Sequence, residues 1–226
     1  MSLERLEKGV EGARENVHAW FAEREKTGGL SKVHDWSHVH AVARHAKIVA
    51  EELALKEGLE AETAKQVGLL AEAAGYLHDV VRKPTESAPH GTMGEKFIKR
   101  AYAAPTLPTS IKKRFFTEFT PKEIETIAAA VGLHESSWKE LEEKTAGVPA
   151  VTRIIAQALV AGDKAFEASG YRVIERRSFF VGKERMQKEL KHLEDYYGEK
   201  APLYAVAMES AMRLHAINAL KDMPAW

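Results

Sequence analysis

The sequence predicts an all-α fold, arranged as a single-domain helical bundle. Apolar residues recur at intervals of three and four positions through nearly every segment, which is the period of an amphipathic helix. The alternation of apolar and polar residues that marks a strand is missing, and the β-branched residues lie within helical stripes. The 226 residues suffice for one hydrophobic core, and no internal repeat, linker or composition break divides them. We therefore expect one domain over residues 1–226, with its core from about residue 20 to about residue 220.

Caps and breakers place the individual helices. The second predicted helix has Asp35 or Ser37 as its N-cap and ends at Gly58. Thr120 and Glu123 form a capping box around Pro121, which predicts another helix start. With these signals, the predicted helices cover residues 2–26, 35–57, 61–80, 90–103 and 110–118, begin again at 121 and at 149, and end with 182–197 and 202–220.

Composition limits the partners of the protein. The 33 basic and 33 acidic side chains cancel, so the overall charge does not favour a nucleic-acid polymer. No window is apolar enough for a membrane span, and the charged first residues do not resemble a secretion signal. Without cysteine there are neither disulfides nor thiolate metal sites. We expect a cytoplasmic protein that acts on a small molecule, and a homo-oligomer is compatible with this composition.

The adjacent pair His78-Asp79 is the strongest candidate for chemistry. His78 continues the apolar stripe of the third predicted helix, after Ala74 and Gly75, and Asp79 follows it directly. A carboxylate beside a core face is costly to bury without a partner, and a divalent cation is a suitable one. Neighbouring side chains diverge by about 100° around a helix, but they can converge where its last turn unwinds. The alternative is a His-Asp pair that is hydrogen-bonded in the core without metal.

Other histidines and aspartates share this placement at the beginning or end of an apolar helical stripe: His38, His90, His134 and Asp163. Each alone is more often an ordinary polar residue of a helix end, but together they indicate a shared metal site.

The remaining histidines are weaker candidates. His34 and Asp35 form a second pair, which we place behind the metal ligands because Asp35 is well explained as a helix cap. His45 borders an apolar stripe and stays undecided. His134-Glu135 begins like a zinc-protease helix, but the second histidine of that motif is missing. The positions on mixed faces, expected on the surface or in the ordinary core, are His18, His40, His192 and His215.

The pattern resembles the HD-domain superfamily of metal-dependent phosphohydrolases. The order His38, His78-Asp79, Asp163 matches the superfamily's H…HD…D signature. Local context is similar as well, in the segments His34-Asp35-Trp36-Ser37-His38, Leu77-His78-Asp79-Val80 and Gly162-Asp163-Lys164. The resemblance covers about residues 20–220. The chain differs from many members at Ala41, where they carry arginine, and in the segment after Asp163, and these differences concern the substrate more than the metal site.

The resemblance implies a site of one or two divalent ions. Its first ion would be held by His38, His78, Asp79 and Asp163, and Asp79 would bridge to a second ion completed by His90 and His134. Imidazole and carboxylate ligands suit Mn, Fe, Co, Ni or Zn, and suit Mg less well.

The implied reaction is hydrolysis of a nucleotide or another small phosphoester by attack of a metal-bound water, with Asp79 as the catalytic residue. Arg82, Lys83 and Lys164 are candidates to bind the substrate phosphate. Two alternatives remain open. The superfamily also contains di-iron oxygenases with the same ligand set, and a metal-containing binding module without catalysis would carry the same motifs.

Overall fold

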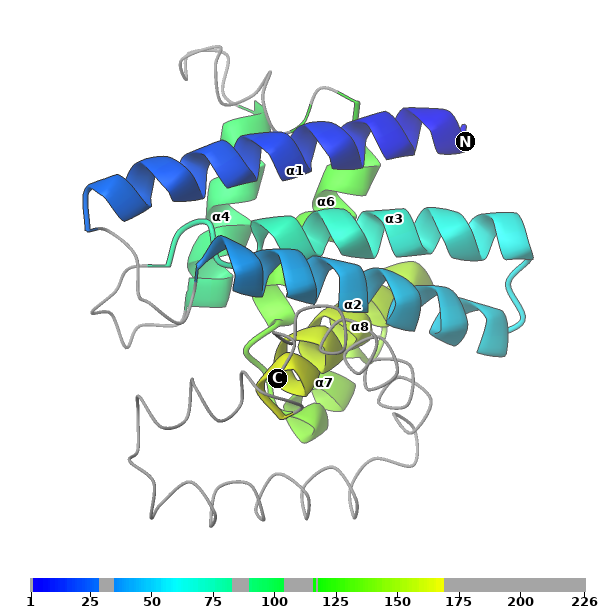
Figure 1. Ribbon diagram of the computed structural model, residues 1–226. Coiled ribbons are helices and arrows are strands. Elements are labelled where there is room, and N and C mark those ends of the chain that lie inside the picture. The colour runs from blue at the N-terminus through cyan, green and yellow to red at the C-terminus, as the bar shows by residue number, and fades with distance from the viewer. Residues whose placement is uncertain (1, 29–34, 83–89, 104–115, 117, 169–226) are drawn as a thin grey trace, which may run out of the picture.

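The computed structural model describes residues 2–28, 35–82, 90–103, 116 and 118–168, and in this part of the chain every regular element is a helix (Figure 1). The helices are α1 (Leu3–Lys26), α2 (Trp36–Lys56), α3 (Ala61–Leu77), α4 (His90–Ala103), α6 (Pro121–Leu133), α7 (Trp138–Thr145) and α8 (Ala150–Ala168). The predicted all-α class is confirmed for these residues. The helices expected at 182–197 and 202–220, and nearly all of the one expected at 110–118, lie outside the described residues.

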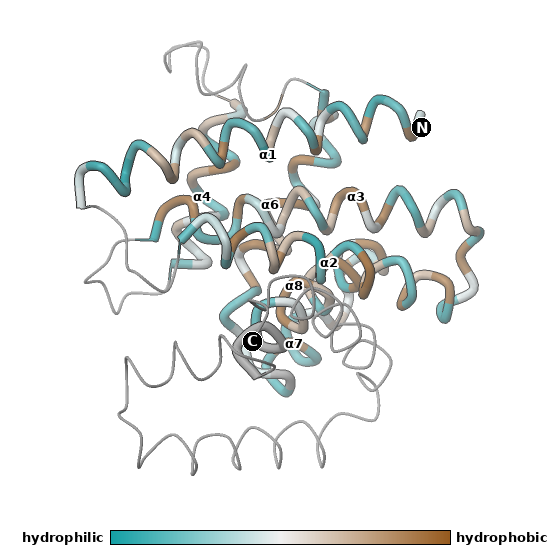
Figure 2. The backbone as a smooth tube through the Cα atoms, viewed as in Figure 1, coloured by the Kyte–Doolittle hydropathy of each residue, from teal (hydrophilic) through white to brown (hydrophobic). Residues whose placement is uncertain are grey.

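α2 and α3 form an antiparallel pair at the centre of the molecule (Figure 1). α1 runs along α3, α8 packs against α2, and α4 and α6 pack against each other and close the bundle beyond α3. Figure 2 shows α1 as largely hydrophilic with hydrophobic residues at intervals, whereas α6 and α8 contain longer hydrophobic stretches. The buried side chains of α1 are spaced by three or four residues, as a single inward stripe requires: Leu6, Val10, Ala13, Val17 and Phe21.

Small residues bring α2 and α3 close together. A Cβ atom added at Gly75 of α3 would lie 2.4 Å from the Cα of Ala43 in α2, so only glycine permits this approach. Gly58, with a φ of +82°, makes the short turn between the two helices. The distance between their backbones is therefore fixed near the end of α3, where the candidate site begins.

Polar caps define where the helices begin. Asp35 is the N-cap of α2 and accepts a hydrogen bond from the His38 N–H at 3.0 Å, as the sequence predicted. The predicted capping box of Thr120 and Glu123 starts α6. α7 was not predicted, although Ser137 and Glu140 form a second capping box that marks its start. The polar composition of this short helix hides its period.

An ion pair joins α1 to the start of α6. Arg5 of α1 contacts Glu123 of α6 through two atom pairs, Nη2–Oε1 at 2.5 Å and Nη1–Oε2 at 3.0 Å. Burial raises the pKa of Glu123, but the hydrogen bonds with Arg5 and Thr120 lower it by more than burial raises it. The pKa therefore lies below the ordinary value of 4.5. The ionised carboxylate therefore stabilises the fold.

Within the described residues, none of the helices combines the length and the apolar composition that a membrane-spanning segment requires.

Replacing Gly75 with alanine tests the close contact of α2 and α3. The new methyl group would meet the backbone of Ala43, which cannot move away as a side chain can, so we expect Gly75→Ala to lower the free energy of unfolding by about 1–3 kcal/mol. Gly68→Ala, in the same helix, is the matched control, because its methyl would meet only the side chain of Glu51. Denaturant unfolding followed by circular dichroism measures both, and equal stability of the two variants would contradict this account.

The pair of Arg5 and Glu123 predicts a dependence of stability on pH. Because the folded-state pKa of Glu123 is lowered, its contribution is present above pH 4.5 and is lost as the pH falls through the folded-state pKa. We expect Glu123→Gln to cost about 1–2 kcal/mol at pH 7 and progressively less below pH 4.5. The control is Glu125→Gln, at an exposed position of the same helix. Urea unfolding in metal-free buffer at several pH values measures the difference, which should not stay constant with pH.

Candidate metal centre

The end of α3 brings His78 and Asp79 to one point. α3 ends at Leu77, earlier than the predicted residue 80, and His78 is its C-cap. The N–H of Val80 then bonds to the Leu77 carbonyl at 3.4 Å, as in a tight turn. This change of direction lets two adjacent side chains converge, with His78 Nε2 3.5 Å from Asp79 Oδ2.

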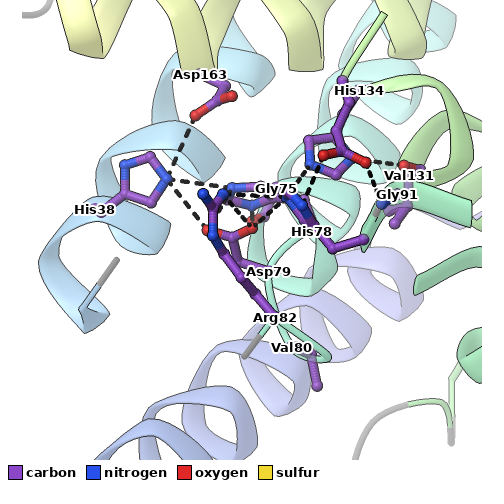
Figure 3. A network of polar contacts seen from close by, with 12 residues as sticks. His38, Gly75, His78, Asp79, Val80, Arg82, Gly91, Val131, His134 and Asp163 are labelled. Atoms are coloured by element: carbon purple, nitrogen blue, oxygen red, sulfur yellow. Dashed lines mark hydrogen bonds and ion pairs between the residues drawn. The ribbon is translucent and has the colours of Figure 1, made fainter. Parts of the chain in front are cut away.

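His38 and Asp163 complete one half of the cluster (Figure 3). His38 lies in the first turn of α2, and its Nε2 is 3.3 Å from His78 Nε2 and 3.6 Å from Asp79 Oδ2. Asp163 extends from α8 and places Oδ1 3.4 Å from the same His38 nitrogen. Thus three helices contribute to this half, which we call the first half-site: His38, His78, Asp79 and Asp163.

The other oxygen of Asp79 faces a second group. His90, the first residue of α4, has Nε2 3.1 Å from Asp79 Oδ1. His134, the C-cap of α6, has Nε2 3.0 Å from His90 Nε2. Asp79, His90 and His134 form the second half-site. Asp79 is shared, with one oxygen toward each half-site.

The six residues predicted from sequence therefore meet at one place. Five of them are buried, with relative exposures of 1% for His38, His78 and His134, 2% for Asp79 and 9% for His90. The side chain of Asp163 is 14% exposed. A polar cluster of this depth requires compensation from within the protein or from a bound ion.

The hydrogen bonds of two histidines fix which nitrogen faces the cluster. His78 Nδ1 donates to the Gly75 carbonyl and His134 Nδ1 donates to the Val131 carbonyl, each at 2.7 Å. A carbonyl only accepts, so the proton is on Nδ1 and the Nε2 lone pair points inward. Burial lowers the pKa of His78, and it lowers the pKa of His134 to about 3, so both rings are neutral. Neutral imidazole is the form that binds metal.

The donor set fits a divalent ion. Both oxygens of Asp79 are buried and have no hydrogen-bond partner of acceptable geometry. Nitrogens bound to one ion at about 2.1 Å, at angles of about 90–109°, lie about 3.0–3.4 Å apart. The nitrogen pairs of the cluster, at 3.3 Å for His38–His78 and 3.0 Å for His90–His134, fall in this range. Two groups of ligand atoms that could hold a metal ion are present among the described residues: His38, His78 and Asp79, and Asp79, His90 and His134.

Of the predicted phosphate-binding residues, only Arg82 has a described side chain. Its Nη1 lies 3.6 Å from Asp79 Oδ1 and 3.2 Å from His90 Nε2, and the side chain is 33% exposed. Lys83 lies outside the described residues, and Lys164 belongs to α8, but its side chain is not described.

The pair His34-Asp35 was predicted to lie behind the metal ligands. Asp35 caps α2 and also accepts a hydrogen bond from Ser37 Oγ, so it holds the turn that carries His38. His34 lies outside the described residues. His45 is buried in α2, and His40 lies against Trp36 and Tyr76. His192 and His215 are outside the described residues.

Sequence reasoning missed three residues that support the cluster. Trp20 and Arg24 of α1 both donate to the Val80 carbonyl, at 3.3 and 3.0 Å, and Arg24 also donates to the Arg82 carbonyl at 2.8 Å. Burial lowers the pKa of the Arg24 guanidinium. Glu135 was set aside with the incomplete protease motif, yet its Oε1 lies 2.7 Å from His90 Nδ1.

Comparisons of this chain with models of known protein families, with curated proteins and with solved structures found no match. The functional interpretation therefore rests on the order of the motifs and on the geometry of the cluster.

The shared position of Asp79 predicts that metal binding depends on its charge. We expect the wild-type protein to retain divalent metal after dialysis and to gain about 2.7 kcal/mol of stability at an ion concentration a hundred times the Kd. Asp79→Asn removes the negative charge common to both half-sites and should abolish both effects. His18→Gln, an exposed position on α1, is the control. Elemental analysis and melting temperatures with Mn, Co, Ni and Zn measure the outcome, and undiminished metal in Asp79→Asn would contradict the site.

Proposed function

We propose that this protein is a metal-dependent phosphohydrolase of the HD type, acting on a nucleotide or another small phosphoester. The observation that carries the proposal is the meeting of six histidines and aspartates, from the ends of α2, α3, α4 and α6 and from within α8, around the shared carboxylate of Asp79. The order of these residues along the chain resembles the superfamily signature. The compatible all-helical fold supports the same proposal.

The protein side chains have separable tasks in this proposal. The ligand atoms are imidazole nitrogens and carboxylate oxygens without sulfur, a set that suits Mn, Fe, Co, Ni or Zn. When bound, such an ion supplies Lewis acidity and lowers the pKa of a water molecule toward neutrality. Asp79 acts as the catalytic residue by holding its charge at the centre of the cluster, with an oxygen toward each half-site.

Arg82 is suited to bind the phosphate. Its guanidinium lies at the edge of the cluster, is partly exposed, and can present parallel N–H donors to two phosphate oxygens. Its positive charge is near the place where negative charge develops on the phosphoryl group during hydrolysis. Asp163 is also partly exposed, on the side of the first half-site. Its carboxylate has no N–H group to offer a phosphate, so in this proposal it serves as a metal ligand.

Turnover measurements test the proposal. We expect phosphate release from p-nitrophenyl phosphate or a panel of nucleotides in the presence of Mn, Co, Ni or Zn, and a loss of at least about a hundredfold in kcat in His78→Ala and Asp79→Asn. Arg82→Gln should raise KM, because it removes the proposed phosphate contact. The variant should still bind metal, because the positive charge of arginine opposes cation binding and its loss does not weaken the site. His18→Gln should match the wild type.

Two results would overturn the proposal. Phosphate release that is unchanged in Asp79→Asn would separate the activity from the cluster. A metal-loaded protein that is silent across the substrate panel but consumes oxygen when iron is bound would favour oxygenase chemistry instead.

A further inference from the structure

Glu135 connects the second half-site to the backbone of α4. The residue follows His134 at the end of α6, and its side chain is 34% exposed. Its two oxygens have different partners, because Oε1 lies 2.7 Å from His90 Nδ1 and Oε2 accepts from the Gly91 N–H at 2.6 Å. One carboxylate thus holds both the ring and the backbone at the start of α4.

The contacts of His90 define its tautomer. Because a carboxylate accepts hydrogen bonds, the contact with Glu135 places the proton on Nδ1. On the other side of the ring, Nε2 faces an acceptor, Asp79 Oδ1 at 3.1 Å, and a donor, Arg82 Nη1 at 3.2 Å. With its proton on Nδ1, the neutral ring presents at Nε2 the lone pair that an ion shared with Asp79 would need, as His78 and His134 do.

The position of His90 explains why it needs a side-chain partner. His78 and His134 lie at the C-terminal ends of helices and donate to the backbone carbonyl three residues earlier. His90 is the first residue of α4, so no preceding turn of its helix offers such a carbonyl. Glu135 supplies the acceptor from another helix, with a full negative charge. A charged acceptor makes a stronger hydrogen bond than a carbonyl and makes the opposite nitrogen a better ligand.

Close packing keeps Glu135 in register with His90. A Cβ added at Gly91 would lie 3.1 Å from the carbonyl oxygens of Val131 and Gly132 and 3.2 Å from Glu135 Oε2. The start of α4 therefore packs directly on the end of α6, and the carboxylate has a fixed place between them.

We propose that Glu135 is a positioning residue for the second half-site: it holds His90 in the Nδ1–H tautomer and thereby determines the affinity for an ion bound by Asp79, His90 and His134. The proposal rests on the proposed function, since it assumes that the cluster binds metal. The metal affinity of the first half-site should not depend on Glu135.

Glutamine is an informative replacement because it is nearly the same shape but has one acceptor instead of two. In one orientation its amide group would face the Gly91 N–H, donor against donor. In the other it would donate to His90 Nδ1, which forces the ring proton onto Nε2 and removes the lone pair that a metal needs. Either orientation weakens the second half-site.

Equilibrium dialysis with Co²⁺ or Mn²⁺ tests the affinity. For Glu135→Gln we expect the affinity for the second equivalent of metal to fall about ten- to a hundredfold, with the first equivalent unchanged. Glu135→Asp, which keeps the carboxylate, should restore part of the loss. Glu125→Gln, an exposed position of α6, is the matched control and should bind like the wild type. Loss of both equivalents in Glu135→Gln, or of neither, would overturn the proposal.

A second measurement does not need metal. The ¹⁵N chemical shifts of His90 in the metal-free protein report its tautomer, which we expect to be Nδ1–H in the wild type and to shift toward Nε2–H in Glu135→Gln. An unchanged tautomer in the variant would overturn the role of Glu135. A wild-type protein that binds no ion would overturn the proposed function, and the shifts would still decide whether Glu135 sets the tautomer.

Discussion

The buried carboxylate of Asp79 is the constraint on which the cluster depends. Its two oxygens lie among imidazole nitrogens whose lone pairs point inward, and neither oxygen has a hydrogen bond of acceptable geometry. An uncompensated charge at this depth would cost several kcal/mol (on the order of the penalties for buried ions). A cation bound between the half-sites would compensate this charge, beside the guanidinium of Arg82 at 3.6 Å from Asp79 Oδ1. The unfavourable free energy of burying the Asp79 charge is offset by stabilising interactions elsewhere in the helices. These include the helix caps, the close glycine contacts and the ion pair of Arg5 with Glu123.

Much of this architecture could be predicted from local patterns. Helical periods and caps placed α1, α2, α4 and the start of α6 within a residue or two. The cluster was predictable because each of its members continues or begins an apolar stripe, and such positions face the core. Helical periodicity could not show that these six residues come together in space. That came from the resemblance of the motif order, and the distances among His38, Asp79, His90 and Asp163 agree with it.

The features that sequence reasoning missed are those that depend on contacts between distant segments. Glu135 meets Gly91 across 44 residues, and Arg24 reaches the Val80 carbonyl across 56, and no helical period relates such positions. Glu135 in particular occupies an exposed place after a helix, where a solvated charge is the ordinary expectation. The end of α3 at Leu77 also depended on tertiary structure, because the turn that follows is held from outside by α1.

The hydrogen bonds from α1 to the backbone after α3 affect which substitutions this segment tolerates. In these contacts Trp20 and Arg24 bind main-chain oxygens of Val80 and Arg82, and every amino acid offers the same oxygen there. The identity of Val80 can therefore change without removing these backbone hydrogen bonds, whereas the proposed role of Arg82 depends on its own side chain. Trp20 and Arg24 of α1, far from Asp79 in sequence, thus help to hold the turn that follows α3 in place.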